Sequence, residues 1–175
     1  MNFAHVTLGD KAPEVVRVVV EIPQRTSNKY EYDEEMDEIM LDRVLHSPMF
    51  YATEYGFVPG TRSEDGDHLD IMVLTTYPTF PGCVLLARPV GVLAMEDEEG
   101  IDPKILAVAD KDPHFKNVTT LEDVNEHLKA EIGHFFASYK TLEDKWAKVS
   151  GWQGKDEALR LIVEGKERFD AEKHI

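Results

Sequence analysis

The spacing of apolar residues changes from strand-like to helix-like about two-thirds of the way along this chain, and this change constrains the fold most. Up to residue 110 the apolar residues form short runs rich in β-branched side chains, separated by proline and glycine. Such runs are typical of short strands in a small barrel or sandwich. Beyond residue 119 apolar residues recur at three- and four-residue spacing, which predicts amphipathic helices.

We expect strands at residues 15–22, 29–32, 39–44, 71–74 and 105–109, with one or two more in residues 84–95. Residues 49–60 are read as a turn-rich segment and residues 146–154 as a loop. The helices are indicated by two apolar series: Leu121, Val124, Leu128, Ile132, Phe135 and Tyr139, then Ala158, Leu161, Ile162 and Phe169. Thr119 or Thr120 is the expected N-cap of the first helix.

These elements predict an α+β, mainly β fold in which a small barrel carries two packed helices. A chain of 175 residues suits a single domain. We therefore expect one domain over residues 1–175, with the barrel in about 15–110 and the helical part in about 119–172.

The net charge of −15 comes from 34 acidic residues against 19 lysines and arginines. Nucleic acid is disfavoured as a partner because its phosphate backbone requires a basic surface. An acidic surplus serves either solubility or the binding of hard divalent cations. The sequence shows no signal peptide and no apolar stretch long enough for a membrane span, so we expect a cytoplasmic protein without membrane contact.

The segment Asp65-Gly66-Asp67-His68-Leu69-Asp70, which leads into an apolar strand, is the strongest functional signal. Three close carboxylates repel one another unless a cation lies among them, and a divalent cation is the natural candidate. An EF-hand loop is excluded, because Asp70 stands where that pattern needs glycine and Thr76 where it needs glutamate. A solvated aspartate-rich turn is the remaining structural alternative.

Two further acidic groups could bind a metal or could simply face solvent. Residues 33–38 hold five acids in six positions, which we interpret as a solvated hairpin tip. Residues 96–99 are also acidic and are followed by Asp102 and Lys104. Alone this second group indicates a solvated hairpin, but together with residues 65–70 it favours a shared metal site if the fold brings the two together.

The segment at residues 65–70 resembles the signature of the soluble family I inorganic pyrophosphatases: Asp, a small residue, Asp, usually proline or glutamate, an apolar residue, Asp. The resemblance extends over about residues 15–155 with similar spacing. It includes Glu21-Ile22-Pro23, Lys29-Tyr30-Glu31, Leu41-Asp42-Arg43, Phe50-Tyr51, Glu54-Tyr55-Gly56-Phe57, Arg88-Pro89-Val90-Gly91-Val92-Leu93, Asp97, Asp102, Lys104, Ile132-Gly133-His134-Phe135-Phe136, Tyr139-Lys140 and Gly151-Trp152.

The resemblance implies hydrolysis of inorganic pyrophosphate to two orthophosphates, with a metal-bound water as nucleophile. It implies several magnesium ions, which manganese or zinc could replace. Asp70 would bridge two of the metals, and Glu31 would lie near the substrate-associated ones. The implied metal-site residues are Asp65, Asp70, Asp97, Asp102 and Glu31.

The resemblance also assigns catalytic and substrate-binding roles. Asp67 would be the general base, Tyr55 would hydrogen-bond near the nucleophile, and Glu21 would support the water network. The implied substrate-binding residues are Lys29, Arg43, Tyr51, Lys104, Tyr139 and Lys140. The family further implies a five-stranded barrel of OB type, and the chain length resembles that of its bacterial homo-hexamers.

Three positions depart from the family pattern. His68 stands where proline or glutamate is usual, and we expect it to be exposed and inert, with a pH-dependent loop as the alternative. Glu54 replaces the commoner asparagine or aspartate. Ser138 replaces a second helix histidine found at a subunit contact in many bacterial members, which puts details of the assembly in question.

Two rival functions remain open at this point. A metal-dependent hydrolase of nucleoside triphosphates would use similar chemistry, although the chain has no Walker-type glycine loop. An OB-type binding module or a calcium-binding protein would bind without turnover. The acidic charge argues against a single-stranded nucleic acid module, which needs a basic groove.

Overall fold

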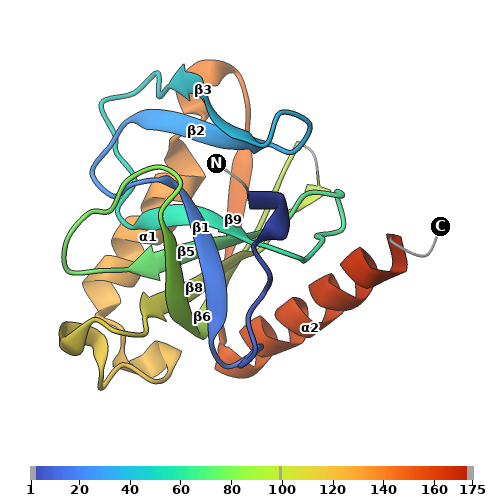
Figure 1. The fold of residues 1–175 in the computed structure, drawn as a ribbon. Coiled ribbons are helices and arrows are strands. Elements are labelled where there is room, and N and C mark those ends of the chain that lie inside the picture. Colours follow the sequence, from blue (N-terminus) through green and yellow to red (C-terminus); the bar gives the residue numbers. More distant parts are fainter. Residues whose placement is uncertain (1–2, 99, 173–175) are drawn as a thin grey trace.

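The computed structural model describes residues 3–98 and 100–172. Within them, strands β1 (Val16–Ile22), β4 (Glu54–Val58), β5 (Leu69–Leu74), β8 (Lys104–Ala109) and β6 (Val84–Asp97) are hydrogen-bonded in that order. Pairing of β1 with β6 closes these strands into a ring (Figure 1). The β5–β8 pair is parallel, whereas the other pairs in the ring are antiparallel. The predicted five-stranded arrangement is therefore confirmed.

Strand β6 extends beyond the ring, where it pairs with β7 (Gly100–Ile101), and its residues 91–97 also pair with β9 (Ala147–Gly154). A separate two-stranded sheet is formed by β2 (Asn28–Asp33) and β3 (Glu38–Val44), seen at the top of Figure 1. Its turn holds the acidic residues that were expected at a hairpin tip. Residues 29 and 43 are cross-strand partners in this hairpin.

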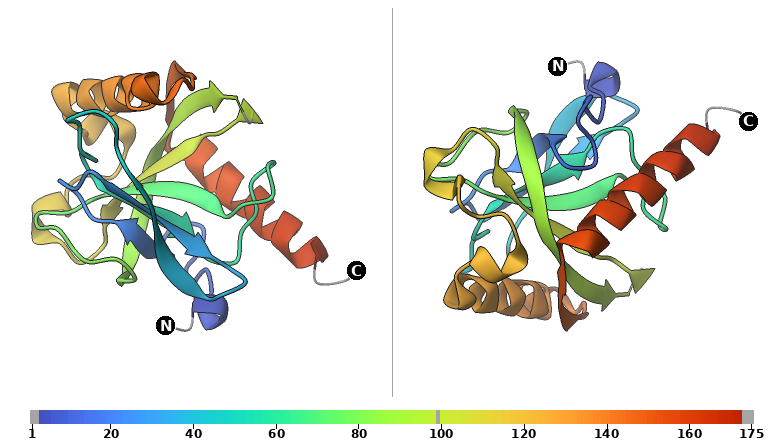
Figure 2. Two further views of the ribbon diagram at one scale, coloured as in Figure 1. Left: turned by 90° about the horizontal axis from the view of Figure 1, so that it is seen from above. Right: turned by 90° about the horizontal axis from the view of Figure 1, so that it is seen from below.

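Two α-helices pack against the strands, as predicted (Figure 2). Helix α1 (Glu126–Ser138) packs near β9, and α2 (Lys155–Glu172) packs against β6. Four short 3₁₀ turns complete the described secondary structure: η1 (Phe3–His5), η2 (Pro113–Phe115), η3 (Leu121–Asp123) and η4 (Thr141–Glu143). No helix in the described part of the chain is both long and apolar enough to cross a membrane.

The predicted start of the first helix was wrong. The N-cap is Asn125, whose side chain accepts hydrogen bonds from the amides of residues 127 and 128. Thr119 and Thr120 instead donate their amides to Asp123 and precede the turn η3. The apolar spacing runs through both elements because Leu121 and Val124 are buried in the same core as the helix.

Three strands were also missed, of which β7 (Gly100–Ile101) is only two residues long. Strand β4 was read as a turn because its five residues are buried on both faces, so no polar–apolar alternation marks it. Strand β9 was read as a loop, since it contains small and polar residues and includes Gly151 at φ 131°. Its pairing with β6 is a tertiary contact that the local pattern does not encode.

The alternation of side chains along β5 and β8 places Asp70 and Lys104 on the same side of the sheet. On β5, Met72 and Leu74 pack in the core that includes the aromatic residues of α1, whereas Ile71 packs in the core that includes α2. Asp70 has the same parity as Met72, and Lys104 on β8 has the same parity as Leu106 in the α1-facing core. The two charged side chains therefore point to the same face.

Candidate active site

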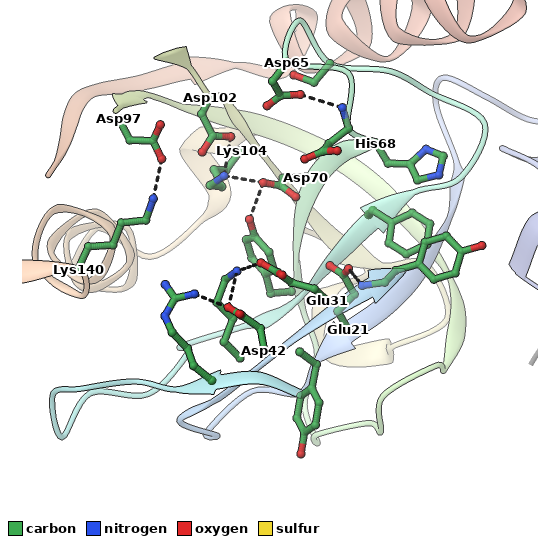
Figure 3. Close-up of a pocket in the computed structure, with 18 of the residues that line it drawn as sticks. Glu21, Glu31, Asp42, Asp65, His68, Asp70, Asp97, Asp102, Lys104 and Lys140 are labelled. Atoms are coloured by element: carbon green, nitrogen blue, oxygen red, sulfur yellow. Dashed lines mark hydrogen bonds and ion pairs between the residues drawn. The ribbon is translucent and has the colours of Figure 1, made fainter. Parts of the chain in front are cut away.

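A cleft of about 770 Å³ lies among the hairpin β2–β3, the loop before β5, the ends of β6 and β8, and the segment after α1 (Figure 3). Nine carboxylates and five cationic side chains line it, with tyrosines between them. The carboxylates are Glu21, Glu31, Glu34, Asp42, Asp65, Asp67, Asp70, Asp97 and Asp102, and the cations are Lys29, Arg43, Lys104, Lys140 and Lys145.

Lys104 lies at the base of the cleft and is only 3% exposed. Its Nζ lies 2.5 Å from Oδ2 of Asp70 and 2.6 Å from Oδ1 of Asp102. The Tyr55 hydroxyl donates to the same Asp70 oxygen at 2.6 Å. Burial lowers the pKa of Lys104, but the two carboxylates outweigh it, so the pKa is raised and the ammonium stays charged.

Glu21, on β1, is almost completely buried beside this cluster. Its Oε1 accepts the backbone amide of Tyr32 at 2.7 Å, which ties β1 to the hairpin. Burial, reinforced by the charge of Asp70, raises the pKa of Glu21 to about 8. The carboxyl group is therefore largely protonated at neutral pH in the absence of a cation.

The loop before β5 carries the two exposed aspartates. Gly66 has φ 97°, a left-handed conformation that glycine adopts without strain, and it lets the loop turn tightly. The Asp67 amide donates to Oδ1 of Asp65 at 3.0 Å. Burial, followed by the charges of Asp65 and Asp70, raises the pKa of Asp67.

The hairpin forms the opposite wall. Lys29 forms ion pairs with Glu31 and with Asp42, and burial lowers its pKa. Arg43 contacts Asp42 and places NH2 2.7 Å from Oε2 of Glu143 in η4. These contacts orient both hairpin cations along the edge of the cleft.

The remaining wall combines the end of β6 with the segment after α1. Lys140 Nζ lies 2.7 Å from Oδ2 of the buried Asp97 and 3.6 Å from Oε1 of Glu98. Tyr139 is buried beside Lys140, and burial raises the pKa of its hydroxyl. The phenol therefore remains a neutral donor at physiological pH.

The structure brings together almost every predicted site residue, although they come from strands and loops that are far apart in the chain. The exception is Tyr51, which was expected to line the site. Tyr51 is buried in the core beneath the cleft, with its ring centroid 5.4 Å from that of Tyr55 and 4.8 Å from that of Phe135. Tyr51 therefore supports Tyr55 from beneath and is not among the cleft-lining residues.

Several cleft residues were not predicted: Asp42, Glu34, His68 and Lys145. The expectation that His68 is exposed was wrong, because its side chain is 12% exposed and its ring stacks on Phe57 at a centroid distance of 4.8 Å. Burial lowers its pKa. The only sequence signal for Asp42 was its place beside Arg43. Glu34 was not singled out because it lies in the acidic run of residues 33–38, which was interpreted as solvated.

The donor chemistry of the cleft fits a hard divalent cation. Carboxylate oxygens are the ligands that magnesium takes, and the carboxylates outnumber the cationic groups. Burial and mutual repulsion raise the pKa of both Asp67 and Asp102, an electrostatic cost that a bound cation would relieve. In residues 3–98 and 100–172, no three side chains already converge in a metal-binding geometry.

A closed ring of strands beside a cleft of mixed carboxylates and cations defines a class of site that binds a polyanion together with hard cations. Comparison with known proteins narrows this class. The profile of a family described as "Inorganic pyrophosphatase" matches residues 18–170. The chain therefore belongs to the inorganic pyrophosphatase family, and the resemblance read from its sequence is confirmed.

Individual relatives agree with this assignment. An inorganic pyrophosphatase of Thermus thermophilus is 49% identical over 164 residues, covering 92% of this chain and 94% of the relative. One from Sulfolobus acidocaldarius is 52% identical over 157 residues, covering 88% and 91% of the two chains. A crystal structure of the Thermus thermophilus enzyme superposes with a TM-score of 0.94 at 46% identity, covering 97% of this chain and 99% of that one.

Proposed function

We propose that the cleft is the catalytic centre at which this family member hydrolyses inorganic pyrophosphate to two orthophosphates. One observation carries the proposal: carboxylates and cations from separate strands, a loop and the segment after α1 converge on one cleft. A solvated turn would not bury Lys104 between two aspartates. The extent of the family match supports the reaction assigned to it.

The cationic side chains would hold the substrate. Pyrophosphate carries several negative charges, and the five cations already lie on different walls of the cleft. Arg43 is suited to bidentate contact with phosphate oxygens, whereas Lys29, Lys104 and Lys140 act as point charges. Tyr139 would add a neutral hydroxyl donor.

Asp67 would act as general base on the attacking water. It lies on the exposed side of the cleft between Asp65 and Asp70, on a loop held by the Ser63 amide, which donates to the Asp67 carbonyl at 2.7 Å. Tyr55 holds one oxygen of Asp70 in place. Glu21 would accept or return a proton within the surrounding water network.

Asp65, Asp70, Asp97, Asp102 and Glu31 would hold the magnesium ions on which the proposed reaction depends. Bound magnesium would neutralise phosphate charge and lower the pKa of a coordinated water. Manganese or zinc would be the expected substitutes. Asp70 and Asp102 contact the same Lys104 ammonium, so each has its carboxylate already turned into the cleft.

A single catalytic domain, a homo-hexameric assembly and a cytoplasmic location complete the proposal. The resemblance of the chain length and sequence to bacterial family members supports the hexamer. The ring and both helices share contacts through β6 and β9, which supports treating residues 3–98 and 100–172 as one unit.

The test is phosphate release from pyrophosphate with and without magnesium, for the wild type, Asp67→Asn and the exposed control Asp156→Asn on α2. We expect magnesium-dependent release that falls about 10²–10⁴-fold in Asp67→Asn alone. Hydrolysis of ATP in preference to pyrophosphate would support the rival nucleotide hydrolase. Folded wild-type protein that releases no phosphate with magnesium would refute the proposal and favour a binding module.

A further inference from the structure

The hairpin β2–β3 carries Lys29, Glu31 and Arg43, yet its two strands form a sheet separate from the ring. Side-chain contacts must therefore hold it at the distance from the ring that the cleft requires. One pair before the end of the hairpin ladder, the Tyr32 ring stacks on Phe57 of β4 at 5.0 Å. This contact fixes one point but leaves the tip to be held by other residues.

Two residues of the acidic turn hold the hairpin tip. Asp37 accepts the backbone amides of Phe3 and Ala4 at 2.9 and 3.3 Å, whereas Glu34 contacts residues beside the Asp67 loop. The Glu34 carboxylate makes a two-armed contact with Arg62, from NH1 to Oε1 at 2.5 Å and from NH2 to Oε2 at 2.9 Å. The same Oε1 lies 2.8 Å from Nε2 of His68. Glu34 thus joins the hairpin to residues on both sides of the Asp65–Asp67 loop.

The two partners of Glu34 are themselves fixed from other directions. His68 stacks on Phe57, and its Nδ1 lies 2.8 Å from the carbonyl oxygen of Thr61. Arg62 lies over the Phe169 ring at 5.2 Å and donates from Nε to Glu172 at 3.0 Å, both on α2. The side chains of Arg62 and His68 are only 13% and 12% exposed. Together they form a fixed docking site for the Glu34 carboxylate.

The exposure of Glu34 itself, 47%, would ordinarily make such an ion pair weak. Fork geometry is the recognised exception, because two parallel hydrogen bonds fix direction as well as distance. The hydrogen bond from Arg62 lowers the pKa of Glu34, which keeps the carboxylate charged. Glu34 is therefore a fixed attachment point in a turn that is otherwise exposed to solvent.

We propose that Glu34 is a positioning residue: by docking on Arg62 and His68, it sets the hairpin cations at the distance from the Asp67 loop that substrate binding requires. This inference rests on the proposed function of the cleft. It also gives His68 a task that proline, one of the two usual residues at this position in the family pattern, has no polar group to perform.

Glu34→Ala tests the inference, with Glu35→Ala as the matched control. Glu35 lies next in the same turn, carries the same charge and is exposed, and its side chain makes no hydrogen bond or ion pair with the described part of the chain. We expect Glu34→Ala to raise KM for pyrophosphate about tenfold while kcat changes by less than about threefold. The tenfold change corresponds to the loss of one bidentate, charge-assisted ion pair. Glu35→Ala should leave both constants near wild type.

Hydrogen–deuterium exchange gives a readout that is independent of activity. Amides of residues 28–44 should exchange faster in Glu34→Ala than in the wild type or in Glu35→Ala, while those of β5 stay protected. Equal KM values and equal exchange in the two variants would overturn the inference. If the wild type itself shows no magnesium-dependent hydrolysis, the proposed function fails, while faster hairpin exchange in Glu34→Ala alone would still support the attachment.

Discussion

Glu54 offers a sharp test of how this fold is held together. Its side chain is fully buried (0% exposed) although it is a carboxylate on a central strand. Oε2 accepts the Thr79 hydroxyl at 2.6 Å, and Oε1 accepts the Thr79 amide at 3.1 Å and the Gln24 amide at 3.4 Å. This one group therefore joins β4 to the segment after β1 and to the loop after β5.

Replacing Glu54 by alanine removes these acceptors and leaves a cavity at the strand. A buried donor without a partner costs about 1–3 kcal/mol. With two amides affected and a smaller cavity cost, we expect a loss of about 3–5 kcal/mol of unfolding free energy. A melting temperature lower by roughly 10 °C follows for a chain of this size. Glu54→Gln keeps one acceptor oxygen, so its expected loss is about 1–2 kcal/mol.

The assay is urea unfolding followed by tryptophan fluorescence, at one fixed protein concentration because assembly would shift the midpoint. The m-value should be unchanged in both variants, since the same surface is exposed on unfolding. An alanine variant within about 1 kcal/mol of the wild type would refute the reasoning, because it would mean that water replaces the carboxylate without cost.

Two further predictions concern a close backbone approach and a pH dependence. A Cβ at Gly56 would lie 2.0 Å from the Val19 carbonyl oxygen, whereas one at Gly133 on α1 meets nothing within 4 Å. Gly56→Ala should therefore fail to fold or lose more than about 4 kcal/mol, whereas Gly133→Ala should be neutral or stabilising by up to about 1 kcal/mol; equal urea midpoints would contradict this. Although burial opposes it, hydrogen bonds from Thr76 and His114 lower the pKa of Asp112 below its ordinary 3.8. Because the folded-state pKa is lower than the ordinary value, the stabilising effect of the Asp112 carboxylate is present above about pH 4 and is lost as the pH falls through the folded-state pKa. Asp112→Asn should therefore weaken the fall of the urea midpoint on acidification below about pH 4, and an unchanged pH dependence would refute the assignment.

Local sequence determined most of the strands and the existence of both helices, because alternation and three-to-four spacing report which face of an element is buried. It also indicated that residues 65–70 lead into a strand, although that strand begins at Leu69, two residues before the expected start. The local pattern missed β4 and β9, as well as the two-residue β7. The first is buried on both faces, and the second exists only through its pairing with β6.

For the site, the sequence supplied the residue types and, through a family resemblance, their expected roles. Which groups touch was decided by closure of the ring and by docking of the hairpin. Sequence spacing gave no indication that Glu34 would reach His68, that Arg43 would meet Glu143, or that Tyr51 would lie below the cleft.

The difference has a physical reason. Whether a segment is a strand or a helix depends on neighbours within a few residues, so the sequence by itself determined the elements and the chemistry they carry. The contacts of a charged side chain depend on groups that are far away in the chain, and their strength depends on burial. Only the tertiary structure therefore decided that Lys104 lies between two aspartates and that an acidic turn docks on Arg62.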